Sequence, residues 1–127
     1  MTIALRGLHA TLRPYAEALV AYGNQLGMNV RITSVFRSLA QQQALRSNYE
    51  LCVARGRFPS NDSYGAGMSC RWPANRAGES GHNYGVAWDS VAEKMDDWTA
   101  LRRWAGWHVP ENDAIHAELP DWQQYLV

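Results

Sequence analysis

A segment without regular periodicity, from Gly56 to Gly81, most restricts what this 127-residue chain can fold into. The segment is crowded with Gly, Pro, Ser and Asn, which interrupt helices and strands and favour turns. A loop of this length is uncommon inside a small domain, and such loops are usually functional or disordered. We interpret it as a substrate-facing loop, so the helices and strands have to form in the two flanking segments.

The segment before the loop predicts a helix, a strand and a second helix. Apolar residues recur every three or four positions from Leu8 to Leu26, which predicts a helix that stops at the following glycine. Residues 29–35 alternate polar and β-branched side chains and predict a strand. Ser38 and Gln41 form a capping-box pattern that opens a helix from Leu39 to Ala54. The apolar face of this helix is expected to contain Leu45, Tyr49, Cys52 and Val53.

The segment after the loop predicts two more strands around a third helix. Residues 85–91 have the strand period, with Trp88 and Ser90 on one face and Asp89 on the other. Asp96 is expected to cap a helix that ends at the glycine at position 106. Residues 115–119 predict a final short strand, and a turn or short helix is expected from Pro120 onward. This order of elements predicts an α+β domain with a small, mostly antiparallel sheet flanked by helices.

Composition excludes several classes of partner. The 12 Lys and Arg residues equal the 12 Asp and Glu residues, so no basic excess is present to neutralise a nucleic-acid backbone. No segment approaches the roughly 18 consecutive apolar residues of a membrane span. The N-terminus lacks the apolar block and cleavage site of a signal peptide. We therefore expect one monomeric domain over residues 1–127, made in the cytoplasm, with no nucleic-acid partner and no membrane span.

The two cysteines, Cys52 and Cys70, are too few for a disulfide framework and lack a CxxC spacing. We expect buried, unreactive thiols. A single bridge between the two cysteines is the alternative.

Residues with metal-binding chemistry gather after the loop. His82 lies where the glycine-rich loop enters a strand, and a turn over residues 83–85 would fold its side chain toward Asp89, farther along that strand. His116 and Glu118 share one face of the last strand because side chains alternate, and Asp113 lies just before that strand. Catalytic zinc sites typically use three protein ligands and leave a fourth position for water, which suits a His, Asp and His set. For a single His, a hydrogen-bonded structural role is the alternative.

The run from Ser80 to Asp89, Ser-Gly-His-Asn-Tyr-Gly-Val-Ala-Trp-Asp, resembles the zinc-binding signature of the D-Ala-D-Ala carboxypeptidase and L-alanyl-D-glutamate endopeptidase family. That signature is Ser-x-His-x-x-Gly-x-Ala-x-Asp, and every defined position matches. Arg37-Ser38 followed by Gln-x-x-Leu, and the terminal segment Asp113-Ala-Ile-His-Ala-Glu-Leu, resemble two further family motifs. These zinc peptidases cut bacterial peptidoglycan and share their fold with the hedgehog signalling domain. The resemblance therefore implies a hedgehog/DD-peptidase-like fold.

The resemblance also implies roles for individual residues. His82, Asp89 and His116 would be the zinc ligands, and Asp113 would be the catalytic base, because the family places its base three residues before the final His. Arg37 would bind a substrate carboxylate or carbonyl and support the developing oxyanion, for which a permanently charged, bidentate guanidinium is well suited.

Four further residues are expected in the outer shell of this site or near the substrate: Ser80, Gln42, Tyr84 and Glu118. Glu118 would orient an imidazole or Arg37, and Gln42 would help the architecture around the site. A turn-stabilising role for Ser80 and packing against the sheet for Tyr84 are the alternatives. Among residues outside these positions, His108 is a rival ligand for which a surface or outer-shell role is favoured. Glu111 is a weaker rival for the base.

Three features depart from the family pattern. Ala117 stands where the family usually has Phe, and Ser90 follows Asp89 where an aliphatic residue is common. The loop over residues 61–76 is longer and more polar than the family pattern leads one to expect. These departures bear on substrate specificity more than on metal binding.

The resemblance implies a zinc-dependent hydrolase that cuts an amide in the stem peptide of peptidoglycan. The absence of a signal peptide, an anchor and a wall-binding module resembles the compact endolysins of phages that infect Gram-negative hosts. Those enzymes reach the periplasm after the inner membrane is breached, and they commonly cut the L-alanyl-D-glutamate bond, which we therefore prefer. A D-Ala-D-Ala carboxypeptidase or dipeptidase, and a non-catalytic zinc-containing binding module for the cell wall, are the alternatives.

Overall fold

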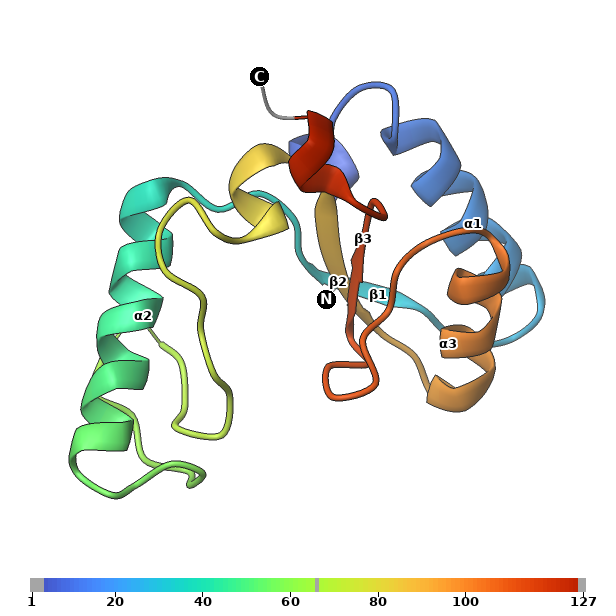
Figure 1. Ribbon diagram of the computed structural model, residues 1–127. Coiled ribbons are helices and arrows are strands. Elements are labelled where there is room, and N and C mark those ends of the chain that lie inside the picture. The colour runs from blue at the N-terminus through green and yellow to red at the C-terminus, as the bar shows by residue number, and fades with distance from the viewer. Residues whose placement is uncertain (1–3, 66, 126–127) are drawn as a thin grey trace. The chain divides into compact units, whose positions relative to one another are not determined.

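The computed structural model describes residues 4–65 and 67–125 (Figure 1). Contacts divide the chain into two compact units, one containing the described residues up to Phe36 and from Tyr84 onward, the other running from Arg37 to Asn83. The single domain expected from the sequence stays a prediction. Over the described ranges, no helix combines the length and the apolar character that crossing a membrane requires.

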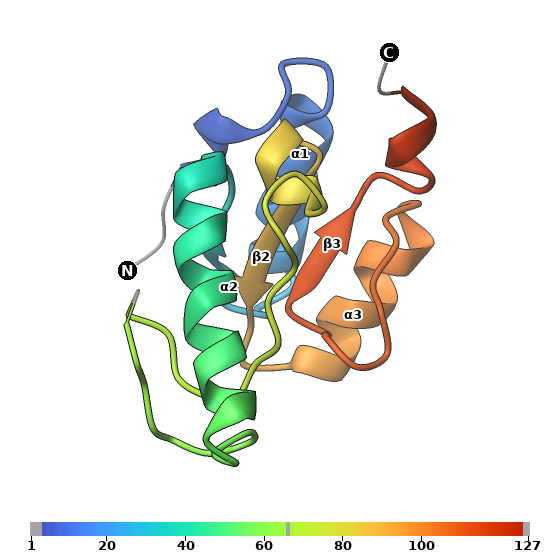
Figure 2. The ribbon, with the colours of Figure 1, turned by 60° about the vertical axis from the view of Figure 1, so that its left-hand side comes forward.

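The first unit contains an antiparallel sheet of three strands in the order β1 (Arg31–Ser34), β2 (Ala87–Val91) and β3 (His116–Glu118). Figure 2 shows β2 and β3 side by side and running in opposite directions. In the register, Trp88 of β2 lies opposite Ala117 of β3, and Asp89 lies opposite His116. The α+β class and the antiparallel sheet predicted from the sequence are therefore confirmed.

Two helices accompany the sheet in this unit, α1 (Arg13–Gln25) and α3 (Met95–Trp104), and they lie next to one another in Figure 1. They and the sheet share one apolar core. Its buried residues are Leu5, Leu8, Ala16, Leu19, Met28, Val30, Ile32, Val35, Trp88, Trp98, Trp107, Val109 and Ala117. Because side chains alternate along a strand, Trp88 points into this core while its neighbour Asp89 is directed to the other face of the sheet.

The helix boundaries differ from the predicted ones at two N-termini. The first helix begins at Arg13 and not at Leu8, because Leu8 is a core residue that follows the short 3-10 helix η1 (Leu5–Gly7). The third helix begins one residue before Asp96, so Asp96 lies in its first turn and does not cap it. The last predicted element is the 3-10 helix η3 (Trp122–Tyr125).

Two of the departures from the family pattern have a packing explanation in this core. Ser90 is fully buried, and its hydroxyl accepts a hydrogen bond of 2.8 Å from the indole N–H of Trp98, a group that an aliphatic residue would leave unpaired. Ala117 is also fully buried, opposite Trp88, whose indole packs edge-on against Trp98 and Trp107. A small residue opposite Trp88 leaves room for these indoles.

The second unit contains α2 (Leu39–Ala54), whose boundaries and capping box agree with the prediction. Its buried residues, Gln42, Asn48 and Cys52, are polar or cross-linked, and Val53, which was predicted on the buried face, is exposed. A loop without regular structure needs partners for its backbone groups. Asn48 meets this need, because its side chain donates to the carbonyl of Met68 at 3.0 Å and accepts from the N–H of Tyr64 at 2.7 Å.

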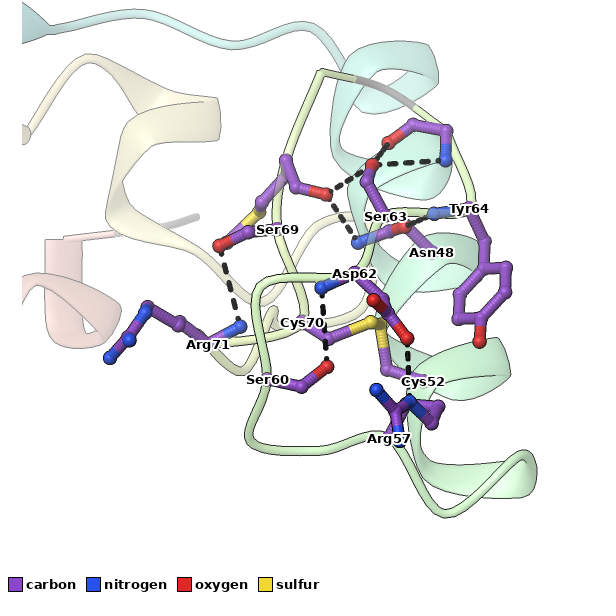
Figure 3. Close-up of a disulfide and its surroundings, with 12 residues drawn as sticks. Asn48, Cys52, Arg57, Ser60, Asp62, Ser63, Tyr64, Ser69, Cys70 and Arg71 are labelled. Atoms are coloured by element: carbon purple, nitrogen blue, oxygen red, sulfur yellow. Dashed lines mark hydrogen bonds and ion pairs between the residues drawn. A yellow bond between two sulfur atoms is a disulfide. The ribbon is translucent and has the colours of Figure 1, made fainter.

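A disulfide joins Cys52 on α2 to Cys70 in the long loop, with the two Cα atoms 5.5 Å apart (Figure 3). The prediction of two buried, unreactive thiols is therefore wrong, and the alternative, a single bridge between the two cysteines, is observed. Sequence spacing could not favour the bridge, because the pairing depends on how the loop folds back along α2. Arg57 and Asp62 form an ion pair near the same cross-link.

Gly85 is held in a conformation that a side chain would disturb. Its φ is +70°, and a Cβ atom there would lie 2.9 Å from the carbonyl oxygen of Gly7. We expect Gly85→Ala to lower the free energy of unfolding by more than the roughly 1 kcal/mol of the left-handed conformation alone, measured by urea denaturation. Gly27→Ala is the matched control, because Gly27 has φ +80° with no atom within 4 Å of its Cβ position. Equal losses in the two variants would contradict the clash.

Candidate metal and catalytic site

Asp89 and His116 are brought together by the pairing of β2 with β3. They are register partners, and the Asp89 Oδ1 atom lies 3.2 Å from Nδ1 of His116. Asp89 is buried and His116 is largely buried. A carboxylate and an imidazole nitrogen therefore face one another on the side of the sheet opposite the core.

Glu118 contacts the other nitrogen of the same imidazole. Its Oε1 atom lies 2.6 Å from Nε2 of His116. Histidines that bind metals commonly donate their second ring N–H to a carboxylate, which leaves the first nitrogen free to face the metal. Glu118 thus contacts Nε2 of His116 while Nδ1 faces Asp89, and the outer-shell role of Glu118 stays a prediction.

In the metal-free protein, the charged forms of His116 and Glu118 stabilise one another. Burial alone would lower the pKa of His116, but its hydrogen bonds to Asp89 and Glu118 outweigh burial and raise the pKa to about 9. Burial would raise the pKa of Glu118, whereas the hydrogen bond and positive charge of His116 lower it, and the net shift is downward. In the metal-free protein, a positively charged His116 is therefore held between the carboxylates of Asp89 and Glu118.

His82 lies in the 3-10 helix η2 (Gly81–Tyr84), which takes the place of the turn predicted over residues 83–85. It is only 2% exposed. The Ser80 hydroxyl accepts a hydrogen bond of 3.3 Å from the backbone N–H of His82, and the Arg37 backbone N–H donates to the carbonyl of His82 at 3.0 Å. The contact of Ser80 is therefore the turn-stabilising one of its two expected roles.

The candidate ligand atoms of His82, Asp89 and His116 all lie within 4.8 Å of one another. Two imidazole nitrogens and one carboxylate oxygen are the donor types that bind catalytic zinc, so the residues fit this metal. The rival ligand His108 does not belong to this group. It is exposed, and its backbone pairs with that of Glu118.

Asp113 lies in the turn that leads into β3. It is half-buried, and its carbonyl accepts a hydrogen bond of 3.0 Å from the backbone N–H of His116. The rival base Glu111 is exposed. The turn thus fixes Asp113 next to a candidate zinc ligand through the backbone.

Arg37 and Gln42 are linked within the second unit. A guanidinium nitrogen of Arg37 lies 3.4 Å from Oε1 of Gln42, a long hydrogen bond, and the Gln42 amide donates to the carbonyl of Asn75 at 2.8 Å. Asn83 donates to the Arg37 carbonyl at 3.0 Å. Gln42 therefore connects Arg37 to the long loop, and its role in the architecture of the site stays a prediction.

Tyr84 stacks on Trp122, with the ring centroids 5.3 Å apart, and remains 39% exposed. This contact supports the packing interpretation of Tyr84, although here the ring packs on η3 and not on the sheet. More than a third of the residue is therefore open to solvent.

Sequence reasoning missed Arg102, a fully buried cation of α3 whose charge interacts with both Asp89 and Asp113. A signal for it existed. Arg102 follows the core residue Trp98 by four positions, so the helical period places it on the buried face of α3.

The chain thus combines a three-stranded antiparallel sheet and its helices with a group of His, Asp and His side chains. No protein-family model matches the sequence, and a search of curated proteins finds no relative. Solved structures do match, and several of them are peptidases.

The fold is similar to that of VanYB in complex with D-alanine-D-alanine, with a TM-score of 0.59 and 17% identity over 92% of this chain and 74% of that one. A second VanY structure, a D,D-pentapeptidase, is in complex with Zn(II). The LD-carboxypeptidase LdcB matches with a TM-score of 0.60 and 16% identity over 94% of this chain and 62% of that one. The Serratia marcescens L-Ala D-Glu endopeptidase ChiX matches with a TM-score of 0.50 and 20% identity over 96% and 86% of the two chains. The chain therefore has the fold of these peptidases, as the sequence resemblance implied.

Proposed function

We propose that the protein is a zinc-dependent peptidase that cuts an amide in the stem peptide of peptidoglycan. The observation that carries the proposal is the convergence of His82, Asp89 and His116, with Glu118 on the outer nitrogen of His116. When bound to these three ligands, zinc would polarise the scissile carbonyl and lower the pKa of a water molecule. The Zn(II) complex of the VanY neighbour supports this metal.

The protein's own residues would supply the proton transfers and bind the substrate. Asp113 would accept a proton from the attacking water and return it to the leaving amine, first as general base and then as general acid. Arg37 would bind a substrate carboxylate or carbonyl through its guanidinium, which Gln42 holds by one of its nitrogens. Glu118 would accept the Nε2–H of His116, so that Nδ1, the nitrogen that faces Asp89, is left without a proton and can bind the metal.

For the bond that is cut, we propose L-alanyl-D-glutamate, in an enzyme that acts as a phage endolysin during host lysis. The match to the endopeptidase ChiX supports this specificity. D-Ala-D-Ala carboxypeptidase activity is the second candidate, because a VanY neighbour binds D-alanine-D-alanine. A binding module without catalysis is less well supported, because a pure binder has no need of Asp113 at its spacing from His116.

Mass spectrometry of purified peptidoglycan after digestion tests the proposal. We expect fragments with new N-terminal D-glutamate that are absent when the zinc is removed with a chelator. Released D-alanine would instead establish the carboxypeptidase. If the zinc-loaded protein binds peptidoglycan and releases neither product, the binding module is correct and the proposed catalysis is wrong.

A further inference from the structure

Arg102 is a buried cation inside the first unit, and its contacts converge on the turn that carries Asp113. The residue is 0% exposed. Its guanidinium donates to the carbonyl of Ala114 at 2.5 Å and to the carbonyl of Ile115 at 3.3 Å. It also donates to the hydroxyl of Thr99 at 3.1 Å and to the carbonyl of Trp98 at 3.4 Å.

A buried guanidinium is costly unless its donors are paired and its charge is compensated. Every nitrogen of Arg102 has a hydrogen-bond acceptor, and the guanidinium carbon lies 5.4 Å from the centroid of the Trp98 ring. Burial lowers the pKa of Arg102 to about 10, with the carboxylates of Asp89 and Asp113 opposing the shift. The side chain is therefore a cation at neutral pH, held close to two candidate residues of the site.

Two of the three main-chain carbonyls that Arg102 binds, those of Ala114 and Ile115, belong to the residues between the candidate base and the last candidate ligand. The carbonyl of Ile115 also accepts a hydrogen bond of 2.9 Å from the N–H of Ser90 in β2. The turn is closed by the hydrogen bond from the N–H of His116 to the carbonyl of Asp113. Arg102 thus links α3 by hydrogen bonds to a turn that is also hydrogen-bonded to β2.

We propose that Arg102 is a positioning residue that holds the Ala114–Ile115 backbone and so sets the place of Asp113 relative to His116. This inference rests on the proposed function for its catalytic consequence. Misplacing a catalytic group by about 1 Å can cost roughly 100-fold in rate without loss of binding. A planar fork with several donors can hold two carbonyls at once, which a lysine cannot reproduce.

The test compares Arg102→Met and Arg102→Lys with Arg103→Met, all loaded with zinc. Arg103 is a matched control, because this exposed neighbour also donates to a main-chain carbonyl, that of Val109, at 2.9 and 3.2 Å. We expect Arg102→Met to lower kcat by about 10- to 100-fold with a much smaller change in KM. Arg102→Lys should recover only part of the loss, and Arg103→Met should match the wild type.

A second readout does not depend on activity. In the metal-free proteins, hydrogen exchange followed by NMR reports on the amides of Ser90 and His116, whose bonds close the turn. We expect both amides to exchange faster in Arg102→Lys than in Arg103→Met, while the core amide of Trp98 remains protected. If Arg102→Met does not fold, Thr99→Val replaces it. This variant removes one hydrogen-bond acceptor of Arg102 and leaves Arg102 in place, so we expect a smaller increase in the exchange of the same two amides.

The outcomes separate this inference from the proposed function. Unchanged exchange at Ser90 and His116 in Arg102→Lys would overturn the positioning role, even in an active enzyme. A KM increase with unchanged kcat would also overturn it, because that pattern indicates lost substrate binding. If the wild type hydrolyses nothing, the proposed function fails, while faster exchange in the Arg102 variants still supports the hold on the turn.

Discussion

Replacing Asp113 with Asn is expected to lower kcat/KM on peptidoglycan by about 10²- to 10⁴-fold, the contribution typical of a general base. The amide has nearly the same shape as the carboxylate but cannot accept the proton of the attacking water. The backbone hydrogen bond between Asp113 and His116 does not involve the side chain, so the turn should persist. Digestion kinetics combined with zinc quantification measure both effects, and the zinc content is expected to stay at the wild-type value.

Glu111→Gln is the control for this variant. Glu111 is exposed, precedes Asp113 by two residues and was the rival base in the sequence. We expect it to retain wild-type kinetics. If the Asp113→Asn variant is active and the Glu111→Gln variant is inactive, Glu111 and not Asp113 is the general base.

The second large effect is expected from the ligands themselves. His116→Ala should lower zinc affinity by more than the roughly 10- to 100-fold that loss of an outer-shell partner produces. The reason is that it removes a donor and leaves the carboxylates of Asp89 and Glu118 without their shared imidazole. Competition with a chromogenic chelator measures the affinity.

Two further variants grade this prediction. Glu118→Gln keeps the ligand but weakens its orientation, so we expect a loss of about 10- to 100-fold. His108→Ala should leave affinity unchanged, because His108 is exposed and outside the candidate ligand group. Zinc binding that survives His116→Ala but is lost in His108→Ala would show that the ligand set is wrong. Asp89→Asn provides a second ligand variant if His116→Ala does not fold.

Local signals in the sequence were sufficient for several elements. Ser38 and Gln41 lie three residues apart, so the start of α2 could be located from the capping box alone. The alternation in β2 and β3 correctly placed Asp89 away from Trp88, and His116 on the same face as Glu118. The pairing of Asp89 with His116 needed the register of the sheet, which no single segment contains.

The features that sequence reasoning missed depend on contacts between distant residues. Leu8 is buried in the core although it lies outside the helix. Its spacing from the helical residues therefore led to a predicted start of α1 at Leu8, whereas the helix begins at Arg13. The buried face of α2 is polar, because Gln42 and Asn48 bind loop backbone, which a search for an apolar stripe cannot detect. Arg102 was overlooked because a charged residue in a helix is ordinarily exposed.

The cross-link between Cys52 and Cys70 makes the state of the long loop depend on the redox chemistry around the protein. Disulfides persist in oxidising compartments, whereas the cytosol keeps thiols reduced. A chain held in a reducing cytoplasm would keep the loop attached to α2 by non-covalent contacts, such as the hydrogen bonds of Asn48 and Gln42 and the packing of Phe58 on Tyr49. Reducing agents added during purification would therefore prepare a protein whose loop differs from that of the oxidised one, and the two preparations have to be assayed as separate species.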